Sequence, residues 1–178
     1  MAAFLLVFVV CGFVSLAGDA ATSDETAHIP AGYTYVDRGD FRMNPEHPPL
    51  AKMWAALPLW LRGTGRPDYG GAAWASADQW RFGFAFLNGP PDDPLRRDPD
   101  RLLHPARAMI LALGVLLCLA VHRWARALWG SEGALLALAL CALSPAVLAH
   151  ARLVTTDLPA ALGFLVALWT FARWLREA

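Results

Sequence analysis

The sequence predicts an all-α membrane protein, and three observations lead to this fold class. First, 57% of the 178 residues are hydrophobic, which is a high fraction for a soluble domain. Second, most of these residues gather into four runs, at 2–18, 108–121, 133–149 and 158–172. Third, none of the four runs contains a charged residue. A helix that is apolar all the way round suits lipid, although the core helices of a soluble bundle are the alternative.

With flanking residues included, we expect four transmembrane helices at about 2–18, 104–121, 133–150 and 157–174, each close to the ~20 residues that cross a bilayer. Residues 1–178 then form one transmembrane domain. The first run resembles a secretory signal peptide because small residues follow it. However, no basic residue precedes it and three further runs come after it, which favours an uncleaved helix.

The polar segment at 19–103 is expected to be an outer loop that includes a juxtamembrane helix. Leu50, Met53, Trp54 and Leu57 recur at helical spacing, and tryptophan suits the headgroup zone of a membrane. The stretch at 63–100 is rich in Gly, Pro and Asp. It is expected to be a loop with one short helix at 72–87.

Arginine placement predicts the orientation of the chain. The connection at 122–132 is short and basic, and the last run ends near Arg173 and Arg176, so both belong in the cytoplasm. The 19–103 segment and the turn at 150–157 then share the outer face. This topology gathers six side chains at one membrane surface: Asp24, Glu25, Glu46, His47, Arg107 and Asp157.

Charge and cysteine content exclude other classes of protein. The formal net charge is zero and no basic stripe with interleaved aromatic residues is present, so no nucleic-acid partner is expected. The three cysteines lie inside apolar runs. They have no disulfide or metal spacing and are interpreted as packing residues.

The adjacent acidic residues Asp24 and Glu25 follow the first apolar run. In most proteins such a pair is a solvated loop feature. At the boundary between water and lipid, partial loss of water makes a carboxylate a stronger base. The pair is therefore a candidate catalytic group.

A proline motif, Asn-Pro-Glu-His-Pro-Pro-Leu-Ala-Lys, occupies 44–52. Its Pro-Pro pair fixes the backbone and makes the residue before it extended, so the motif is a rigid platform for Glu46, His47 and Lys52. The simpler interpretation is a helix start. Glu46 and His47 could supply ligands for a divalent metal ion, which would need a third ligand from elsewhere.

Two further charged residues lie at the ends of apolar runs. Arg107 is either a snorkelling anchor or a clamp for a phosphate, which a guanidinium binds in bidentate fashion. Asp157 follows Thr155 and Thr156. It is either a helix cap or a functional group close to the hydrocarbon.

Together these motifs resemble the protein O-mannosyltransferase and aminoarabinose transferase group, glycosyltransferases with the multi-span GT-C fold that take sugars from polyprenyl-phosphate carriers (glycosyltransferase family 39). The resemblance rests on the Asp-Glu pair, the Pro-Pro-Leu motif, the arginine at the second span and the Thr-Thr-Asp at the fourth. The stretch from Asp24 to Lys52 is most similar to the bacterial branch called phospholipid-carrier-dependent glycosyltransferases.

The resemblance implies a role for each residue. Asp24 matches the catalytic carboxylate, Glu25 would orient the acceptor, and Arg107 matches the arginine that holds the carrier phosphate. Glu46 matches a glutamate associated with metal, and His47 stands where one branch has a lysine near the phosphate. One departure is Ala27, which replaces an arginine of the aminoarabinose branch, so that phosphate contact would fall to another residue such as His28 or Lys52.

We therefore expect inverting sugar transfer from a polyprenyl-phosphate donor to a protein or lipid acceptor, with Asp24 as base and Asp157, His47, Lys52 and Arg107 in the binding site. The expected location is the outer face of a bacterial inner membrane, among membrane lipids. Since the family has about a dozen spans, the chain resembles an N-terminal fragment. The alternatives are a transporter module and a non-catalytic membrane scaffold.

Overall fold

The computed structural model describes residues 1–16, 18–89 and 98–177, and 77% of them are helical. Residues 17 and 90–97, which belong to the predicted first span and outer loop, and residue 178 lie outside the described residues. No strand occurs in the described part of the chain, so the all-α prediction is confirmed. The helices are α1 (Ala2–Leu16), α2 (Ser23–Arg38), α3 (Pro49–Leu61), α4 (Ala72–Ala75), α5 (Gln79–Asn88), α6 (Asp100–Ala142), α7 (Pro145–Ala151) and α8 (Asp157–Glu177).

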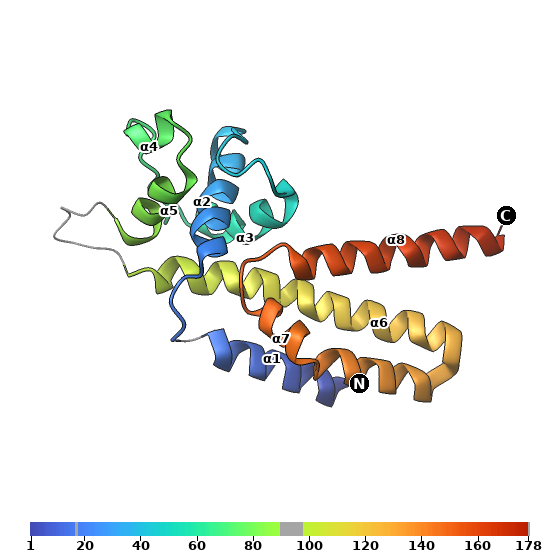
Figure 1. Ribbon diagram of the computed structural model, residues 1–178. Helices are drawn as coiled ribbons and strands as arrows, with labels where there is room; N and C mark the ends of the chain where they lie inside the picture. Colours follow the sequence, from blue (N-terminus) through green and yellow to red (C-terminus); the bar gives the residue numbers. More distant parts are fainter. Residues whose placement is uncertain (17, 90–97, 178) are drawn as a thin grey trace.

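Helix α6 is two helical limbs joined at Gly130, and the chain reverses there (Figure 1). Gly130 has φ 73° and ψ −165°, a conformation that glycine adopts without the steric cost of a Cβ. The predicted segments at 104–121 and 133–150 therefore fall on successive limbs. The second segment is interrupted between α6 and α7, where Ser144 precedes Pro145.

Two helices, α6 and α8, are long and apolar enough to cross a membrane, and α1 is a shorter apolar helix of 15 residues. Large apolar side chains on α8 point away from the protein: Phe164 is 72% exposed and Trp174 is 61% exposed. Such a surface is costly in water. Four spans remain a prediction, because length and composition support two among the residues that the structure describes.

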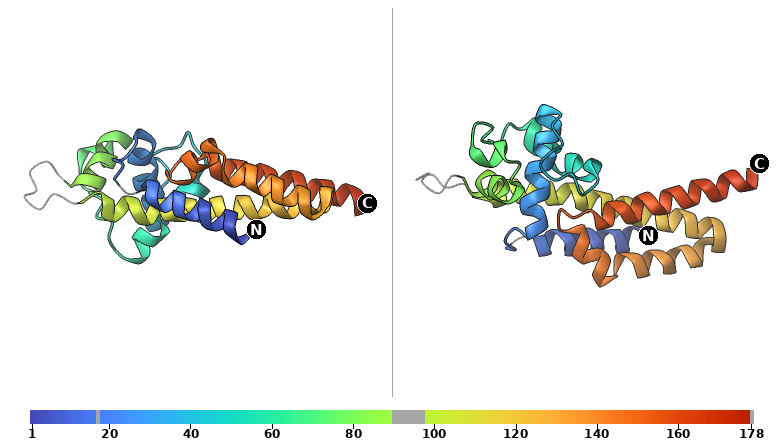
Figure 2. Two further views of the ribbon diagram at one scale, coloured as in Figure 1. Left: turned by 90° about the horizontal axis from the view of Figure 1, so that it is seen from below. Right: turned by 45° about the horizontal axis from the view of Figure 1, so that its top comes forward.

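The predicted outer loop contains helices α2 to α5, more than the juxtamembrane helix and one short helix expected. The helix expected within this segment is present as α3, while its position at a membrane surface stays a prediction. The second expected helix is divided into α4 and α5 by residues 76–78. Helix α2 was not predicted. It lies across the direction of α1, α6 and α8 and gathers with α3, α4 and α5 at one end of the molecule (Figures 1 and 2).

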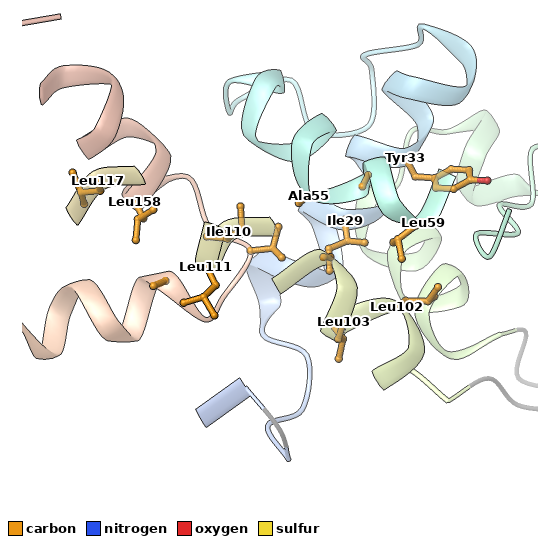
Figure 3. Packing of buried hydrophobic residues seen from close by; sticks show 14 of the residues in the cluster. Ile29, Tyr33, Ala55, Leu59, Leu102, Leu103, Ile110, Leu111, Leu117 and Leu158 are labelled. Atoms are coloured by element: carbon orange, nitrogen blue, oxygen red, sulfur yellow. The ribbon is translucent and has the colours of Figure 1, made fainter. Parts of the chain in front are cut away.

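One hydrophobic cluster joins this end to the long helices. Ile29 of α2, Leu59 of α3 and Leu103 of α6 are completely buried within it, and Figure 3 shows the three helices that carry these side chains converging. Burying large apolar side chains is the main favourable contribution to such packing, at about 2 kcal/mol each. The cluster fixes α2 and α3 on the N-terminal limb of α6.

Helices α2 and α3 touch at Gly32. A methyl group at this position would overlap the backbone carbonyl of Lys52. The absence of a side chain therefore sets how closely the two helices approach, and it places the end of the proline motif beside the middle of α2.

Candidate functional site

The start of α2 is organised by a capping box. Thr22 is the N-cap, its Oγ1 accepts from the backbone N–H of Glu25 at 3.3 Å, and its own N–H donates to Glu25 Oε2 at 3.0 Å. This arrangement satisfies two helix-end donors reciprocally. The Thr-x-x-Glu spacing is visible in the sequence and is the signal that could have predicted α2.

Glu25 is completely buried and forms a bidentate ion pair with Arg107 of α6. Arg107 Nε donates to Glu25 Oε1 and Nη2 donates to Oε2, both at 2.7 Å. The remaining guanidinium N–H groups donate to three backbone carbonyls, those of Leu16, Asp19 and Ala20, at 3.0 to 3.1 Å. A guanidinium has five N–H groups, and all of them are satisfied by protein atoms.

This geometry differs from the roles expected for both residues. Arg107, which is also completely buried, has no N–H left for a carrier phosphate in this arrangement. The carboxylate oxygens of Glu25 likewise accept hydrogen bonds from the helix cap, from Arg107 and from the N–H of Val154 at 3.1 Å. Glu25 is therefore not exposed to a sugar acceptor. Both residues hold elements together. Neither side chain is open to a ligand in this arrangement.

Burial raises the pKa of Glu25, but the hydrogen bonds from Arg107 and Thr22 outweigh this effect and hold the pKa below its ordinary value of 4.5. The carboxylate therefore stays ionised at neutral pH. A charge-assisted, bidentate pair of this kind is among the stronger polar contacts in proteins. The pair of Glu25 and Arg107 joins the start of α2 to α6, and the further donors of Arg107 hold the segment after α1.

Val154, in the connection between α7 and α8, is held on both sides by α2. Its N–H donates to Glu25 as above, and its carbonyl lies 3.0 Å from Nδ1 of His28. Because a carbonyl only accepts, His28 carries its proton on Nδ1. The connection that leads to Asp157 is thereby brought to the start of α2. A shared outer membrane face for the six predicted side chains stays a prediction.

Asp24 is exposed on the first turn of α2. It has no hydrogen bond or ion pair with other described residues. Asp24 lies one helical turn before His28. Burial lowers the pKa of His28 below its ordinary value of 6.5, against a smaller opposite effect of the Asp24 charge. The ring of His28 meets the exposed ring of His47 edge to face, with centroids 5.1 Å apart. Asp24 and His47 are exposed, whereas His28 is buried. These three side chains are called the polar cluster below.

Lys52 is buried beneath the proline motif and fixes it. Its Nζ lies 2.6 Å from the carbonyl of Asn44, 2.8 Å from Asn44 Oδ1 and 3.1 Å from the hydroxyl of Tyr35. These three acceptors use all the donors of an ammonium group. Burial lowers the pKa of Lys52 to about 8, against a smaller opposite effect of Glu46. The predicted contact with substrate is therefore replaced by a structural role at the base of the motif.

Glu46 and Asp157 are the other predicted site residues. Glu46 is exposed and accepts from Nε2 of Gln79 at 3.0 Å. Among the described residues, no three His, Cys, Asp or Glu side chains group as metal ligands. Asp157 begins α8, is exposed, and lies 3.4 Å from Nδ1 of His150.

An apolar groove of about 550 Å³ opens beside the polar cluster, between α3, α6 and α8. Pro48 and Thr156, the neighbours of His47 and Asp157, are part of its wall. The other lining residues are Leu50, Ala51, Trp54, Leu113, Pro159, Ala160, Leu162 and Gly163. The groove therefore borders both the end of the proline motif and the start of α8.

A scan of protein-family models and searches of the curated proteins and of the solved structures found no match to this chain.

Proposed function

We propose that this chain carries the polar half of a membrane glycosyltransferase site that takes a sugar from a polyprenyl-phosphate carrier, as in the family that the sequence resembles. The observation that carries the proposal is the junction of the apolar groove with the cluster of Asp24, His28 and His47. An amphiphilic donor needs such a junction, because its tail and its reacting bond have opposite solvation requirements.

Asp24 is the proposed base. It takes the proton of an acceptor hydroxyl while that oxygen bonds to the anomeric carbon, and the bond from this carbon to the carrier phosphate breaks with its electrons on the phosphate. The anomeric configuration is inverted. Asp24 suits this task because its carboxylate is exposed and free of other described partners, whereas Glu25 is buried in its ion pair.

His47 is the proposed contact of the departing phosphate. It is exposed and adjoins Pro48 at the wall of the groove, and a histidine N–H directed at the phosphate stabilises the charge that develops there. Arg107 holds the segment between α1 and α2 in place, and Lys52 does the same for the proline motif. The isoprenoid tail lies in the groove and supplies binding energy remote from the reacting bond.

The proposal includes membrane placement. The exposed apolar faces of α1 and α8 contact lipid, the arginine-rich end of α6 and α8 lies in the cytoplasm, and α2 to α5 lie at the outer face of a bacterial inner membrane. The acceptor is a protein or lipid hydroxyl. Glu46, exposed beside the motif, is the candidate ligand if a divalent metal ion assists the phosphate.

Sugar transfer from a purified polyprenyl-phosphate donor, measured with the full-length protein in detergent or vesicles, tests this function. Asp24→Asn should lower turnover by at least about 100-fold, the usual contribution of a general base, while membrane insertion is unchanged. Asp98→Asn, an exposed aspartate with no proposed role, is the matched control. Near-normal turnover of the Asp24 variant would exclude it as base, and absence of transfer by the wild type would favour the transporter or scaffold alternative.

A further inference from the structure

A second hollow lies at the opposite end of the long helices from α2 to α5, between the first limb of α6 and α8. Its volume is about 810 Å³. Figure 1 shows these two helix ends extending away from the helices that surround the candidate site. The hollow is therefore separate from that site, and nothing in the proposed reaction uses it.

The two helices contribute matching stripes to this hollow. Leu119, His122, Arg123 and Arg126 come from α6, and Trp169, Ala172, Arg173 and Arg176 come from α8. In both sets the positions follow the i, i+3, i+4, i+7 spacing of a single helix face. The arginines are therefore concentrated on facing surfaces instead of being spread around each helix end.

The charges of the hollow are unbalanced. Among the described residues, four arginines line it against one carboxylate, Glu177, which pairs with Arg173 at 3.2 Å. Arg123, Arg126 and Arg176 have no ion pair with any carboxylate that the structure describes. Four guanidinium groups around one concavity repel one another, and a bound anion would relieve that repulsion. Phosphate is the anion whose geometry matches the guanidinium fork.

The remaining lining is apolar and aromatic, which indicates that the ligand also has an apolar part. Trp124 and Trp169 line the hollow, and the guanidinium carbon of Arg123 lies 6.0 Å from the centre of the Trp169 ring. The apolar length of α8 continues from this end, with Leu168 57% exposed. Arginine with tryptophan at the end of an apolar helix is typical of the headgroup level of a membrane.

We propose that this hollow binds the phosphate headgroup of an anionic phospholipid, with the acyl chains along α8. Basic pockets between helices at the cytoplasmic side of a membrane bind such headgroups. His122, whose buried Nδ1 has no hydrogen-bond partner among the described residues, supplies a further polar atom in the wall. The inference depends on the membrane placement of α6 and α8 and is independent of sugar transfer.

Native mass spectrometry of the purified full-length protein, delipidated and then given phosphatidylglycerol or phosphatidylcholine, tests the site. The wild type should retain phosphatidylglycerol preferentially. Exchanging one arginine of each helix, Arg123→Gln with Arg176→Gln, should weaken this retention by roughly 10-fold or more, since each basic residue near a lipid surface contributes about 1 kcal/mol. The matched control is Arg62→Gln with Arg81→Gln, two exposed arginines at the other end of the molecule.

Three results would overturn the proposal. The first is equal retention of the two lipids by the wild type, which needs no variant and therefore no assumption about folding. The second is an equal loss in the control variant, which would mean that total charge alone attracts the lipid. The third is displacement of phosphatidylglycerol by millimolar inorganic phosphate, which would indicate a site for a soluble anion. None of these measurements uses a sugar donor, so failure here is distinct from failure of the glycosyltransferase proposal.

Discussion

Replacing Arg107 with methionine tests whether the buried pair of Arg107 and Glu25 holds the site together. The substitution removes both guanidinium bonds to Glu25 and the donors to the carbonyls of Leu16, Asp19 and Ala20. It leaves an ionised carboxylate completely buried. Breaking one partner of a buried pair costs about 3–5 kcal/mol. For a chain of this length, that cost corresponds to a fall in Tm of roughly 10 °C.

The assay is thermal unfolding of the purified protein in one detergent, followed by tryptophan fluorescence. Arg62→Met, at an exposed arginine after α3, is the matched control and should leave Tm within about 2 °C, as surface substitutions do. The double variant Glu25→Met with Arg107→Met should lose less than the sum of the two single variants, because it removes both buried charges together.

Acid should act on the same pair. Because the pKa of Glu25 in the folded protein lies below 4.5, its stabilisation is complete above about pH 4.5 and is lost as pH falls through the folded value.

An Arg107→Met variant with unchanged Tm but a raised KM for the lipid-linked donor would refute the structural role of the pair. Such a result would assign Arg107 to the carrier phosphate instead, as the sequence resemblance implied.

Three further predictions concern α3, α2 and the groove. Lys52, the only lysine of the chain, should titrate with a midpoint near pH 8 in ¹⁵N-lysine NMR, because burial lowers its pKa to about 8. Since the pKa of the unfolded state is higher, the stability of the wild type relative to Lys52→Met should rise between about pH 8 and 10.5. A midpoint near pH 10.5 would contradict the burial of Lys52. Gly32→Ala should lower Tm by several degrees because its methyl group meets the carbonyl of Lys52. The control Gly163→Ala, at a position with open space around it, should leave Tm unchanged. Equal Tm values for the two variants would show that α2 and α3 are not in direct contact at Gly32. Gly163→Leu should narrow the groove and raise KM for the polyprenyl donor several-fold without changing KM for the acceptor, and an unchanged donor KM would remove the groove from the proposal.

The sequence predicted the helical class, the helix at 49–61 and the start of α8 at Asp157, since each depends on local patterns of apolar residues, proline and capping groups. It missed α2, whose interior Pro30 and polar composition disguise it. It also counted 133–150 as one span, although Ser144 and Pro145 interrupt that segment.

The predicted site residues differ in how open they are. Asp24 and His47 are exposed, and each lies near His28. Arg107 and Lys52 were expected to face a phosphate but are buried with every donor satisfied. A sequence shows that a charged residue borders an apolar run. It does not show whether that charge finds its counter-charge in the protein or in a ligand.

The sequence by itself determined which residue types are available at the ends of the apolar segments, because composition and periodicity are local properties. Only the tertiary structure decided which of them remain available for chemistry. Arg107 and Glu25 are 82 residues apart, and their pairing depends on α2 crossing α6. Since a buried charge must be compensated where it lies, this crossing pairs two of the candidate site residues with each other and leaves Asp24 exposed.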